Sequence, residues 1–282
     1  MDIAQAKTFL SIVETGNFNK AAEQVHVTQS TVSMRIKTLE DALGQKLFVR
    51  NKSGASLTAA GSQFLKHAQA MVRIWEQARH EVSLPDKFTG VLSVGGQFTL
   101  WDNLLLNWIP WVRSALPELA IRAEVGHSDG LMHQLIEGLL DIGVMYTPQA
   151  RPGIAIEELF TDQLILVSSS EATKGPGDEG YVLVDWGPEF NMSYVQAYPE
   201  IEQPAITVSH GPLGLQHILD NGGSGYFPLR LAEYYLNEGS LHQVQAAPVF
   251  SRPVFMVYPD DRAEDATFNT ALQGLRYVAS SD

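Results

Sequence analysis

No cysteine occurs among the 282 residues of the chain. This absence excludes disulfide bonds, thiolate nucleophiles, Cys-ligated zinc and thiol-based redox sensing, and it suits a reducing cytoplasm. The sequence also lacks an apolar run approaching about 18 residues, and acidic and polar residues (Asp2, Gln5) stand where a signal peptide would be basic. We therefore expect a cytoplasmic protein with no membrane partner.

Low-complexity tracts are absent as well. Hydrophobic residues make up 45% of the chain and charged residues 18%, a balance typical of a folded globular protein rather than a disordered one. The length exceeds the usual span of about 100–200 residues for one domain. Two domains, or one two-lobed domain and a small one, are therefore expected.

Positive charge is scarce overall, but its distribution is uneven. The net charge of −13 argues against a nucleic-acid partner. Residues 1–84, however, hold 10 Lys and Arg against 7 Asp and Glu, a net charge of +3, whereas residues 85–282 hold 9 against 25, a net charge of −16. Such asymmetry indicates a nucleic-acid-binding end joined to an acidic body that repels DNA.

The N-terminal region has the spacing of a helix-turn-helix. Apolar residues recur at helical spacing over residues 2–15, and Gly16 ends that helix. Asn17 can cap a short second helix with small residues at 21 and 22, and Thr28 can cap a third helix that runs to about Leu43 before Gly44. The apolar positions of the first helix are Ile3, Ala6, Phe9, Leu10 and Val13.

The third helix has a polar outer face. Hydroxyl, amide and cationic side chains of this kind hydrogen-bond base edges and phosphates. The spacing alone fits equally well a solvated helix face with capping residues. The segment KLFVRNKSGASLT at residues 46–58 then predicts a β wing that holds two cations near a DNA backbone. The candidate DNA contacts are Thr28, Gln29, Ser30, Thr31, Ser33, Arg35 and Lys37 on the helix, with Arg50 and Lys52 on the wing.

Residues 9–61 resemble, without a gap, the DNA-binding region of LysR-type transcriptional regulators. The resemblance implies a winged helix-turn-helix that binds double-stranded DNA at an interrupted palindrome, as a homodimer or homotetramer, with RNA polymerase as a further partner. Two later segments, LWDNLLLNW and DWGPEF, resemble one subgroup of the family. The match at residues 9–61 is carried by Phe9, Gly16, Phe18, Ala21, Ala22, Thr28, Gln29, Ser30, Ser33, Ile36, Leu39, Glu40, Gly44, Leu47, Phe48, Arg50, Leu57, Thr58 and Gly61.

A longer helix is predicted from the cap Thr58 to about Val82. Its apolar residues are spaced by four and three in alternation, an average of 3.5 that is typical of a coiled-coil seam. The family resemblance implies that two such helices pair in a dimer, whereas the alternative is packing of this helix on its own effector domain. The seam residues are Phe64, Ala68, Met71, Trp75, Ala78 and Val82.

Beyond a hinge at residues 83–90, strand and helix patterns alternate, which predicts an α/β body with parallel sheets. We therefore expect a winged helix-turn-helix at 1–58, a linker helix at 59–84 and an effector-binding domain at 85–282. The resemblance implies two lobes like those of periplasmic binding proteins, about 88–162 with 252–282 and about 163–251. Strands are predicted at 91–94, 121–125, 141–145, 181–185, 205–208, 225–228 and 253–258, and helices at 100–116, 129–139 and 213–219.

Ligands of parallel sheets bind beyond the carboxyl ends of the strands, here in the cleft between the lobes. The predicted cleft loops hold no Lys or Arg, so backbone amides and His127 or His210 hold an anionic effector, or the effector is neutral. Each histidine alone is also explained as a surface or structural residue, and Thr99 either contacts the effector or caps the next helix. The candidate effector contacts are Gln97, Phe98, Thr99, His127, Ser128, Tyr146, Thr147, Ser209 and His210.

Two other functions remain as alternatives. An enzyme lacks support because the sequence contains no P-loop, dinucleotide fingerprint or paired-His metal motif, and its Ser, Asp and His residues are scattered. A solute-binding protein fits the C-terminal body but leaves the first 84 residues unexplained. We therefore expect no catalytic residues, no metal and no cofactor, with one unidentified small molecule as effector.

Overall fold

The first helix begins at a reciprocal cap. In the computed structural model, which describes residues 2–51 and 54–280, the Asp2 carboxylate accepts from the Gln5 amide, and the Gln5 side chain accepts from the Asp2 amide. Gly16 ends this helix with a φ of +64°, which glycine adopts without strain. Asn17 and Thr28 cap the next two helices as predicted. The three are α1 (Ile3–Thr15), α2 (Phe18–Gln24) and α3 (Gln29–Leu43).

A two-stranded wing follows, formed by β1 (Phe48–Asn51) and β2 (Gly54–Leu57) in antiparallel pairing. The Ala55 amide donates to the Gly16 carbonyl at 2.8 Å, which fixes the wing to the end of α1. A Cβ atom on Gly54 would lie 2.4 Å from the same carbonyl oxygen, so this approach requires glycine.

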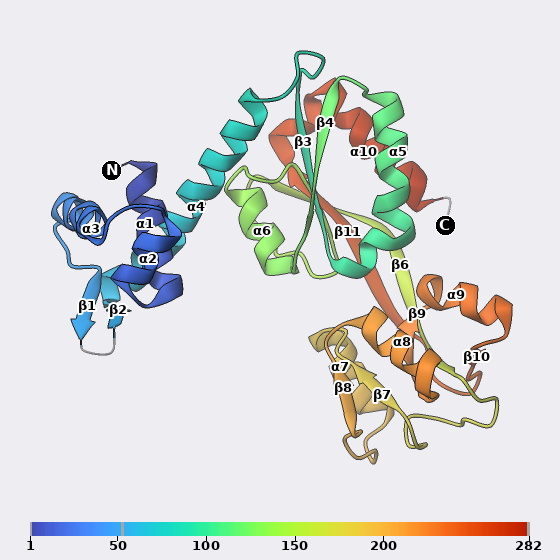
Figure 1. Cartoon of the computed structure of the whole chain (residues 1–282). Helices are drawn as coiled ribbons and strands as arrows, with labels where there is room; N and C mark the ends of the chain where they lie inside the picture. Colours follow the sequence, from blue (N-terminus) through green and yellow to red (C-terminus); the bar gives the residue numbers. More distant parts are fainter. Residues whose placement is uncertain (1, 52–53, 281–282) are drawn as a thin grey trace. The chain divides into compact units, whose positions relative to one another are not determined.

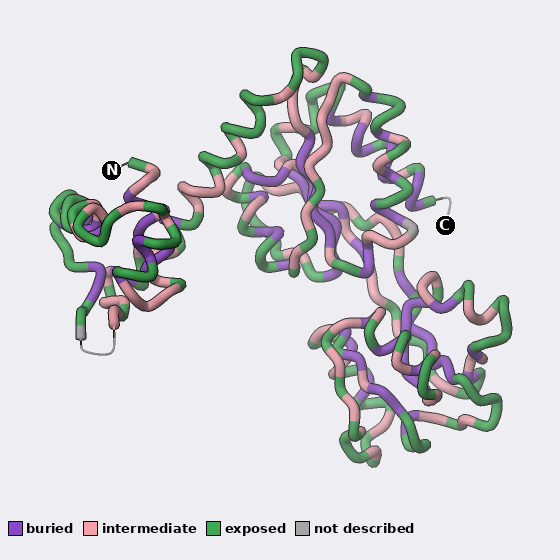
Figure 2. The backbone as a smooth tube through the Cα atoms, in the orientation of Figure 1, coloured by how far each residue is buried: buried purple, intermediate pink, exposed green. Residues whose placement is uncertain are grey.

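Helix α4 (Ala59–Val82) starts at Thr58, whose hydroxyl accepts from the Gly61 amide. Its first half completes the core of the N-terminal unit, because the Phe64 ring lies edge-on to Phe9 at 5.0 Å and Ala68 is fully buried. Its second half is largely exposed, as the green tube in Figure 2 shows. Residues 1–87 form one compact unit and residues 88–282 a second.

Lobe 1 of the second unit is built on a sheet with helices on both faces. Strand β3 pairs in parallel with β4 and β5, and β5 pairs in antiparallel with β11. One apolar core lies against α5 and α10, where the Trp108 indole donates to the Ala271 carbonyl at 3.0 Å, and a smaller core lies beneath α6. The elements are β3 (Gly90–Gly96), α5 (Leu106–Ala115), β4 (Leu119–Val125), α6 (Ser128–Ile136), β5 (Ile142–Met145), β11 (Phe250–Pro259) and α10 (Ala266–Ala279).

Two long antiparallel strands connect the lobes. Strand β6 (Ile154–Ser168) leaves lobe 1 and β11 returns to it, and the two pair along most of their length (Figure 1). The return of residues 253–258 to lobe 1 agrees with the prediction, whereas no strand was expected at the position of β6. The expectation of parallel pairing is wrong for this pair. Their antiparallel direction follows from crossing the same boundary in opposite senses.

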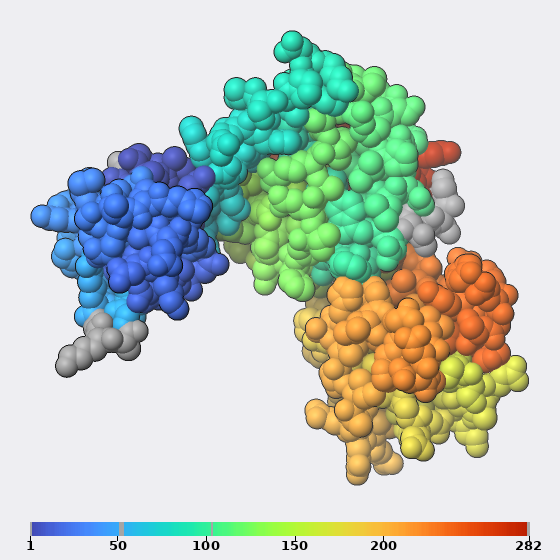
Figure 3. All heavy atoms as spheres, viewed as in Figure 1, coloured from blue at the N-terminus to red at the C-terminus, as the bar shows by residue number. Residues whose placement is uncertain are grey.

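Lobe 2 surrounds a second core that is rich in aromatic side chains. Strands β7 and β8 pair in parallel, whereas β9 and β10 pair in antiparallel with the end of β6. In Figure 3 lobe 2, in yellow to orange, forms a separate mass from the green residues of lobe 1. Its elements are β7 (Val182–Val184), α7 (Pro188–Ala197), β8 (Ile206–Val208), α8 (Gly211–Asn221), β9 (Ser224–Pro228), α9 (Leu229–Glu238) and β10 (His242–Gln243).

The helix predicted from about Leu100 to Leu116 starts differently. A 3₁₀ turn η1 (Phe98–Leu100) and a π-type turn η2 (Trp101–Leu105) precede α5. Apolar periodicity cannot separate these turns from an α-helix, because all three bury similar faces over so few residues. A further 3₁₀ turn, η3 (Asp260–Glu264), connects β11 to α10.

Candidate DNA-binding surface and effector cavity

The start of α3 presents polar side chains to solvent. Thr28, Gln29 and Ser30 are exposed, and the Thr28 hydroxyl accepts from the Thr31 amide while it lies within 3 Å of the hydroxyls of Ser30 and Thr31. Lys37 is exposed just past the middle of the helix. Thr28 therefore does cap the helix, as the alternative interpretation of this face expected. This cap leaves the outward side of the helix accessible.

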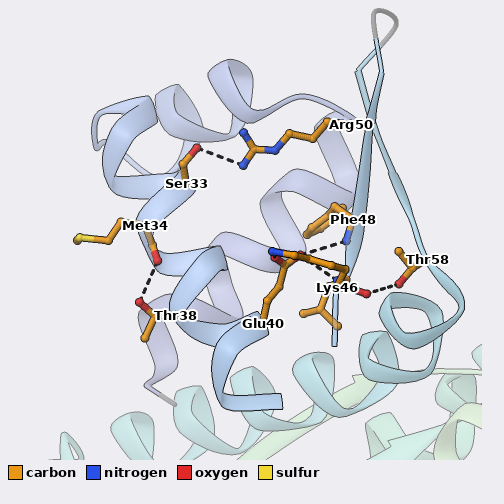
Figure 4. A network of polar contacts seen from close by, with 9 residues as sticks. Ser33, Met34, Thr38, Glu40, Lys46, Phe48, Arg50 and Thr58 are labelled. Atoms are coloured by element: carbon orange, nitrogen blue, oxygen red, sulfur yellow. Dashed lines mark hydrogen bonds and ion pairs between the residues drawn. The ribbon is translucent and has the colours of Figure 1, made fainter. Parts of the chain in front are cut away.

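Ser33 connects the helix to the wing. Its hydroxyl oxygen accepts from the side-chain amide of Gln29 at 2.9 Å. It also accepts from the Arg50 guanidinium at 3.3 Å (Figure 4). The Arg50 guanidinium carbon also lies 3.7 Å from the centroid of the Phe18 ring. Helix and wing candidates are thus brought together in one surface.

Two of the described positions, Arg35 and Met34, differ from the pattern that the sequence suggested. Arg35 is half-buried and donates to the Thr8 hydroxyl on α1 at 3.2 Å, so its guanidinium is anchored inside the domain. Lys52 lies outside the described residues. Met34 was not predicted as a contact, yet it is 63% exposed in the middle of α3, and its thioether points away from the domain in Figure 4.

A buried carboxylate holds the end of α3 against the wing. Glu40 accepts from the Lys46 ammonium at 2.7 Å and from the Leu47 amide at 2.9 Å (Figure 4). Burial raises the pKa of Glu40, but these bonds outweigh that effect and lower the pKa below the ordinary value. The ionised carboxylate therefore stabilises the position of the wing.

The predicted seam of α4 divides into two parts. Phe64 and Ala68 pack into the core of their own unit, and Met71 is half-buried. Trp75 is 45% exposed, Val82 is 88% exposed and Ala78 is also exposed. The 3.5-residue spacing thus combines a buried face in the first half with an exposed apolar face in the second half. Pairing of the exposed part between two chains stays a prediction.

A cavity of about 470 Å³ lies between the lobes. Its wall includes eight of the nine candidate effector contacts, drawn from the ends of strands and the starts of helices. Ser128 is buried behind the wall, where its hydroxyl donates to Gln97 Oε1 at 3.1 Å and accepts from the Thr147 hydroxyl. The wall comprises Gln97, Phe98, Thr99, Val125, Gly126, His127, Tyr146, Thr147, Asp185, Trp186, Gly187, Pro188, Ser209, His210, Gly211 and Arg252.

The two lobes touch across this cavity. Phe98 from lobe 1 lies edge-on to His210 from lobe 2, with ring centroids 4.2 Å apart. Gln97 Oε1 also accepts from the Tyr146 amide at 2.8 Å, which fixes the loop after β5. A ligand in the cavity is therefore in reach of both lobes.

Tyr146 is the centre of a buried polar cluster. Its hydroxyl donates to Asp162 Oδ2 at 2.9 Å and accepts from Arg230 at 3.0 Å. The Thr99 hydroxyl lies 3.1 Å away and, since the single Tyr146 proton goes to Asp162, Thr99 donates to it. Burial raises the pKa of Tyr146, so it stays a neutral phenol.

The cluster contains two arginines, of which Arg230 forms an ion pair and Arg252, among the described residues, does not. Arg230 forms a bidentate ion pair with Asp162, at 2.8 and 3.1 Å. Burial lowers the Arg230 pKa, but its interactions with Tyr146 and Asp162 outweigh that effect and raise the pKa above the ordinary value. Arg252 lies opposite Asp162 on β11, and its guanidinium carbon is 3.4 Å from the Tyr146 ring centroid. Burial lowers the pKa of Arg252. Among residues 2–51 and 54–280, no side chain or carbonyl forms a hydrogen bond or ion pair with Arg252, which lines the cavity.

Sequence reasoning missed Arg252. The predicted cleft loops contain no Lys or Arg, but the cavity receives this cation from strand β11, close to where that strand begins. Residue 252 sits just before the apolar run at 253–258, and only the antiparallel crossing of β6 and β11 places it at the cleft. A charged residue at the edge of an apolar strand was the one available signal.

Three helices start at the cavity wall without a side-chain cap. These are α6 after His127, α7 after Gly187 and α8 after His210. The free amides of a helix N-terminus favour negative charge. Asp185 is the only carboxylate in the wall formed by the described residues, and it accepts from the Gly187 amide and the Asn191 side chain.

Comparison with known proteins identifies both units. Residues 3–62 match the family described as "Bacterial regulatory helix-turn-helix protein, lysR family", and residues 85–280 match the "LysR substrate binding domain". The chain belongs to the LysR family. It is a LysR-type DNA-binding transcriptional regulator with an effector-binding domain.

Relatives and solved structures of the LysR family match the whole chain. The HTH-type transcriptional regulators HdfR of Escherichia coli strain K12 and of Shigella flexneri are each 30% identical over 276 residues, 97% of this chain and of theirs. HdfR represents the subgroup that the segments at 100–108 and 185–190 resemble. The fold matches CbnR complexed with its target DNA (TM-score 0.73, 17% identity, 99% of both chains) and Vibrio fischeri DarR in complex with DNA (TM-score 0.59, 19% identity, 98% of both chains).

The described residues, 2–51 and 54–280, contain neither a metal-binding cluster nor a membrane-spanning helix. No group of three or more His, Asp or Glu side chains there is arranged to hold a metal ion. No helix there is long and apolar enough to cross a membrane.

Proposed function

We propose that DNA binding by this regulator is controlled by an anionic small molecule held in the cavity between the lobes. The observation that supports the anion is Arg252, a half-buried guanidinium with aromatic neighbours and, among the described residues, no carboxylate within hydrogen-bond or ion-pair distance. A partly desolvated charge without a hydrogen-bonded partner is unfavourable, and a ligand carboxylate would offset that cost with charge-assisted hydrogen bonds. With Arg252 in the wall, binding of an anion does not require basic side chains in the cleft loops.

The cavity is also suited to transmitting a signal, because its wall comes from both lobes. Lobe 1 supplies Phe98 and Thr99, and lobe 2 supplies Trp186, Ser209 and His210. A ligand changes an equilibrium only when it binds one arrangement better than another. A ligand touching both lobes meets that condition, whereas one bound to a single lobe does not report their arrangement.

The assembly that we propose is a homodimer paired through the exposed half of α4, with a tetramer as its higher form. Trp75, Ala78 and Val82 leave an apolar stripe in water, which pairing of two chains would bury. A two-fold dimer presents two winged domains to the half-sites of an interrupted palindrome. We further propose a cytoplasmic location, because the DNA target lies there, and RNA polymerase as a further partner. No catalytic step is needed for this function.

At the DNA surface we propose that Gln29 reads a base edge and that Arg50 contacts phosphate. Met34 adds an apolar contact of the kind that recognises a thymine methyl group. Arg35, held by Thr8, positions α3 on α1 rather than reaching the DNA.

A thermal-shift screen tests the effector proposal. Carboxylates and the matching carboxamides are added to the full chain, and a ligand that binds only the folded state raises the melting temperature. Carboxylates should stabilise the wild type but not Arg252→Gln, and Arg252→Lys should respond weakly because a lysine lacks the planar fork. The proposal is rejected if carboxamides stabilise the wild type as well as carboxylates do. A stabilising carboxylate should then also change DNA affinity.

A further inference from the structure

A second cavity, of about 560 Å³, adjoins the first. The two share only Tyr146, Thr147, Trp186 and Arg252, so these four residues form the wall between them. The remaining wall of the second cavity is mainly apolar and comes from the crossing strands and from α7. The apolar side chains are Ile156, Leu164, Phe190, Val249, Phe250 and Phe255.

Charged groups occupy a small part of this second wall. Arg252 is the one cation in it and Glu189 the one anion among the described residues. Arg252 lies against the Tyr146 ring, with its guanidinium carbon 5.3 Å from the Trp186 ring centroid. The guanidinium thus lies close to two aromatic rings and lines both cavities, and none of its N–H groups forms a hydrogen bond with the described residues.

We propose that the second cavity is a separate ligand site for a monoanion with an aromatic or branched apolar body. The apolar body packs against Phe190, Phe250 and Phe255, and the anionic group binds Arg252 from the side opposite the first cavity. Glu189 repels a second negative charge, which selects against dianions. The volume is within the range of small-molecule sites.

Sharing one guanidinium couples the two sites. An anion in either cavity neutralises Arg252, so a second anion meets less positive charge and binds more weakly. Because such coupling is reciprocal, each ligand must weaken the other by the same factor. The second site therefore antagonises the effector, and it does so without any contact between the two ligands.

Methyl NMR on the full chain can distinguish the sites. Ile156 lines only the second cavity and Val125 only the first, so their methyl signals report each site independently. The probe is phenylacetate, compared with phenylacetamide and phenethylamine, which keep the aromatic body but change the charge. Phenylacetate should shift the Ile156 methyl signal with at least fivefold tighter apparent binding than either analogue.

Three variants test the assignment. Ser193 is an exposed position of α7 in the second wall, so Ser193→Trp should fill the site and weaken phenylacetate binding at Ile156 at least tenfold. Met192, an exposed position of the same helix, lies in neither wall, so Met192→Trp should leave this binding unchanged. Arg252→Lys should weaken it about fivefold. The proposal is overturned if Ile156 does not respond to phenylacetate, or if all three probes shift it equally.

The same NMR experiment tests the second site separately from the effector proposal. If carboxylates shift Val125 but not Ile156, the first site stands and the second does not; the reverse result removes the first and keeps the second. Where both respond, saturating one site with its ligand should weaken the other severalfold. Equal affinities with and without the other ligand would show that Arg252 does not couple them.

Discussion

The Arg50 guanidinium lies over the Phe18 ring, with its central carbon 3.7 Å from the ring centroid, and donates to the Ser33 hydroxyl on α3. A cation on a two-stranded wing would otherwise sample many rotamers, at a cost of up to about 2 kcal/mol when it is fixed on binding. Stacking on an aromatic ring and one hydrogen bond reduce that cost. The wing therefore presents its charge next to α3 before DNA arrives.

Arg50→Ala should weaken binding to all DNA sequences about equally. If Arg50 contacts one phosphate, its loss reduces the slope of log affinity against log salt by about one for each bound protomer. Binding measured at four or more salt concentrations gives the slope. Arg50→Lys keeps the charge but loses the planar stacking, so it should keep most of the slope with lower affinity. An unchanged slope in the alanine variant would contradict a phosphate contact.

Gln29→Ala should instead relax the preference for one base in each half-site. In the free protein the side-chain amide of Gln29 donates to the Ser33 hydroxyl, so the Gln29 side chain is held on the outward side of α3. Loss of a bidentate base contact costs about 1–3 kcal/mol of discrimination. Competition binding with single-base variants of the operator measures this value. Lys37→Ala is the control, since loss of a phosphate contact should lower specific and random binding alike.

The helix-turn-helix could be predicted because its signals are local. Asn17, Thr28 and Thr58 each cap the predicted helix through their own side chain, and Gly16 and Gly44 end helices in the left-handed conformation. Caps act over three or four residues, so a sequence reveals them directly. The family resemblance added the function of this surface, which spacing alone left open.

The cavity could be predicted only in part. Gln97, Phe98 and Thr147 follow strand ends, and the rule for parallel sheets placed them correctly at the cleft. Arg252 and its neighbour Asp162 depend on strand pairing between residues about 90 positions apart, which no local pattern shows. Asp162 forms its ion pair with Arg230 and not with Arg252, the residue opposite it on β11, and this choice depends on side-chain geometry.

Trp75→Glu should shift the protein from dimer to monomer. Trp75 lies in the exposed half of α4, and a charge in a coiled-coil seam is destabilising. Sedimentation velocity measures the change, and DNA affinity should fall with it. Ile74 is 50% exposed on the same turn, so Ile74→Glu is a matched control that should leave the dimer intact. Dissociation by Ile74→Glu alone would mean that the seam has a different register.

Acid should loosen the junction between α3 and the wing. The folded pKa of Glu40 lies below the ordinary value of 4.5, so its stabilisation is present above that pH and is lost as the pH falls through the folded pKa. Hydrogen exchange of residues 40–50, corrected for intrinsic rates, should show protection that decreases below about pH 4.5. Glu40→Gln should cost about 1.5 kcal/mol at pH 7 and remove this pH dependence. A variant with the same acid profile as the wild type would exclude Glu40 as the titrating group.

The Thr99 hydroxyl already forms one hydrogen bond, to the Tyr146 hydroxyl, and this bond restricts what it can bind in the cavity. Thr99 lies inside η1, whose N-cap is Gln97, so the alternative that Thr99 caps the following helix is wrong. Its proton goes to Tyr146, which leaves the oxygen as an acceptor in the cavity wall. The effector group that reaches Thr99 must therefore be a donor, a hydroxyl or an ammonium, while the carboxylate binds Arg252.

Thr99→Val tests this assignment because it removes the hydroxyl and keeps the shape of the side chain. Calorimetry should show about tenfold weaker binding of an effector that carries such a donor, which corresponds to about 1.4 kcal/mol. The same variant should bind the matching carboxylate without the donor as well as the wild type does, and Thr99→Ser should bind both normally. Stability without ligand should fall by about 1 kcal/mol, since the bond to Tyr146 is also lost. Equal weakening of both ligands would assign Thr99 to the support of Tyr146 alone.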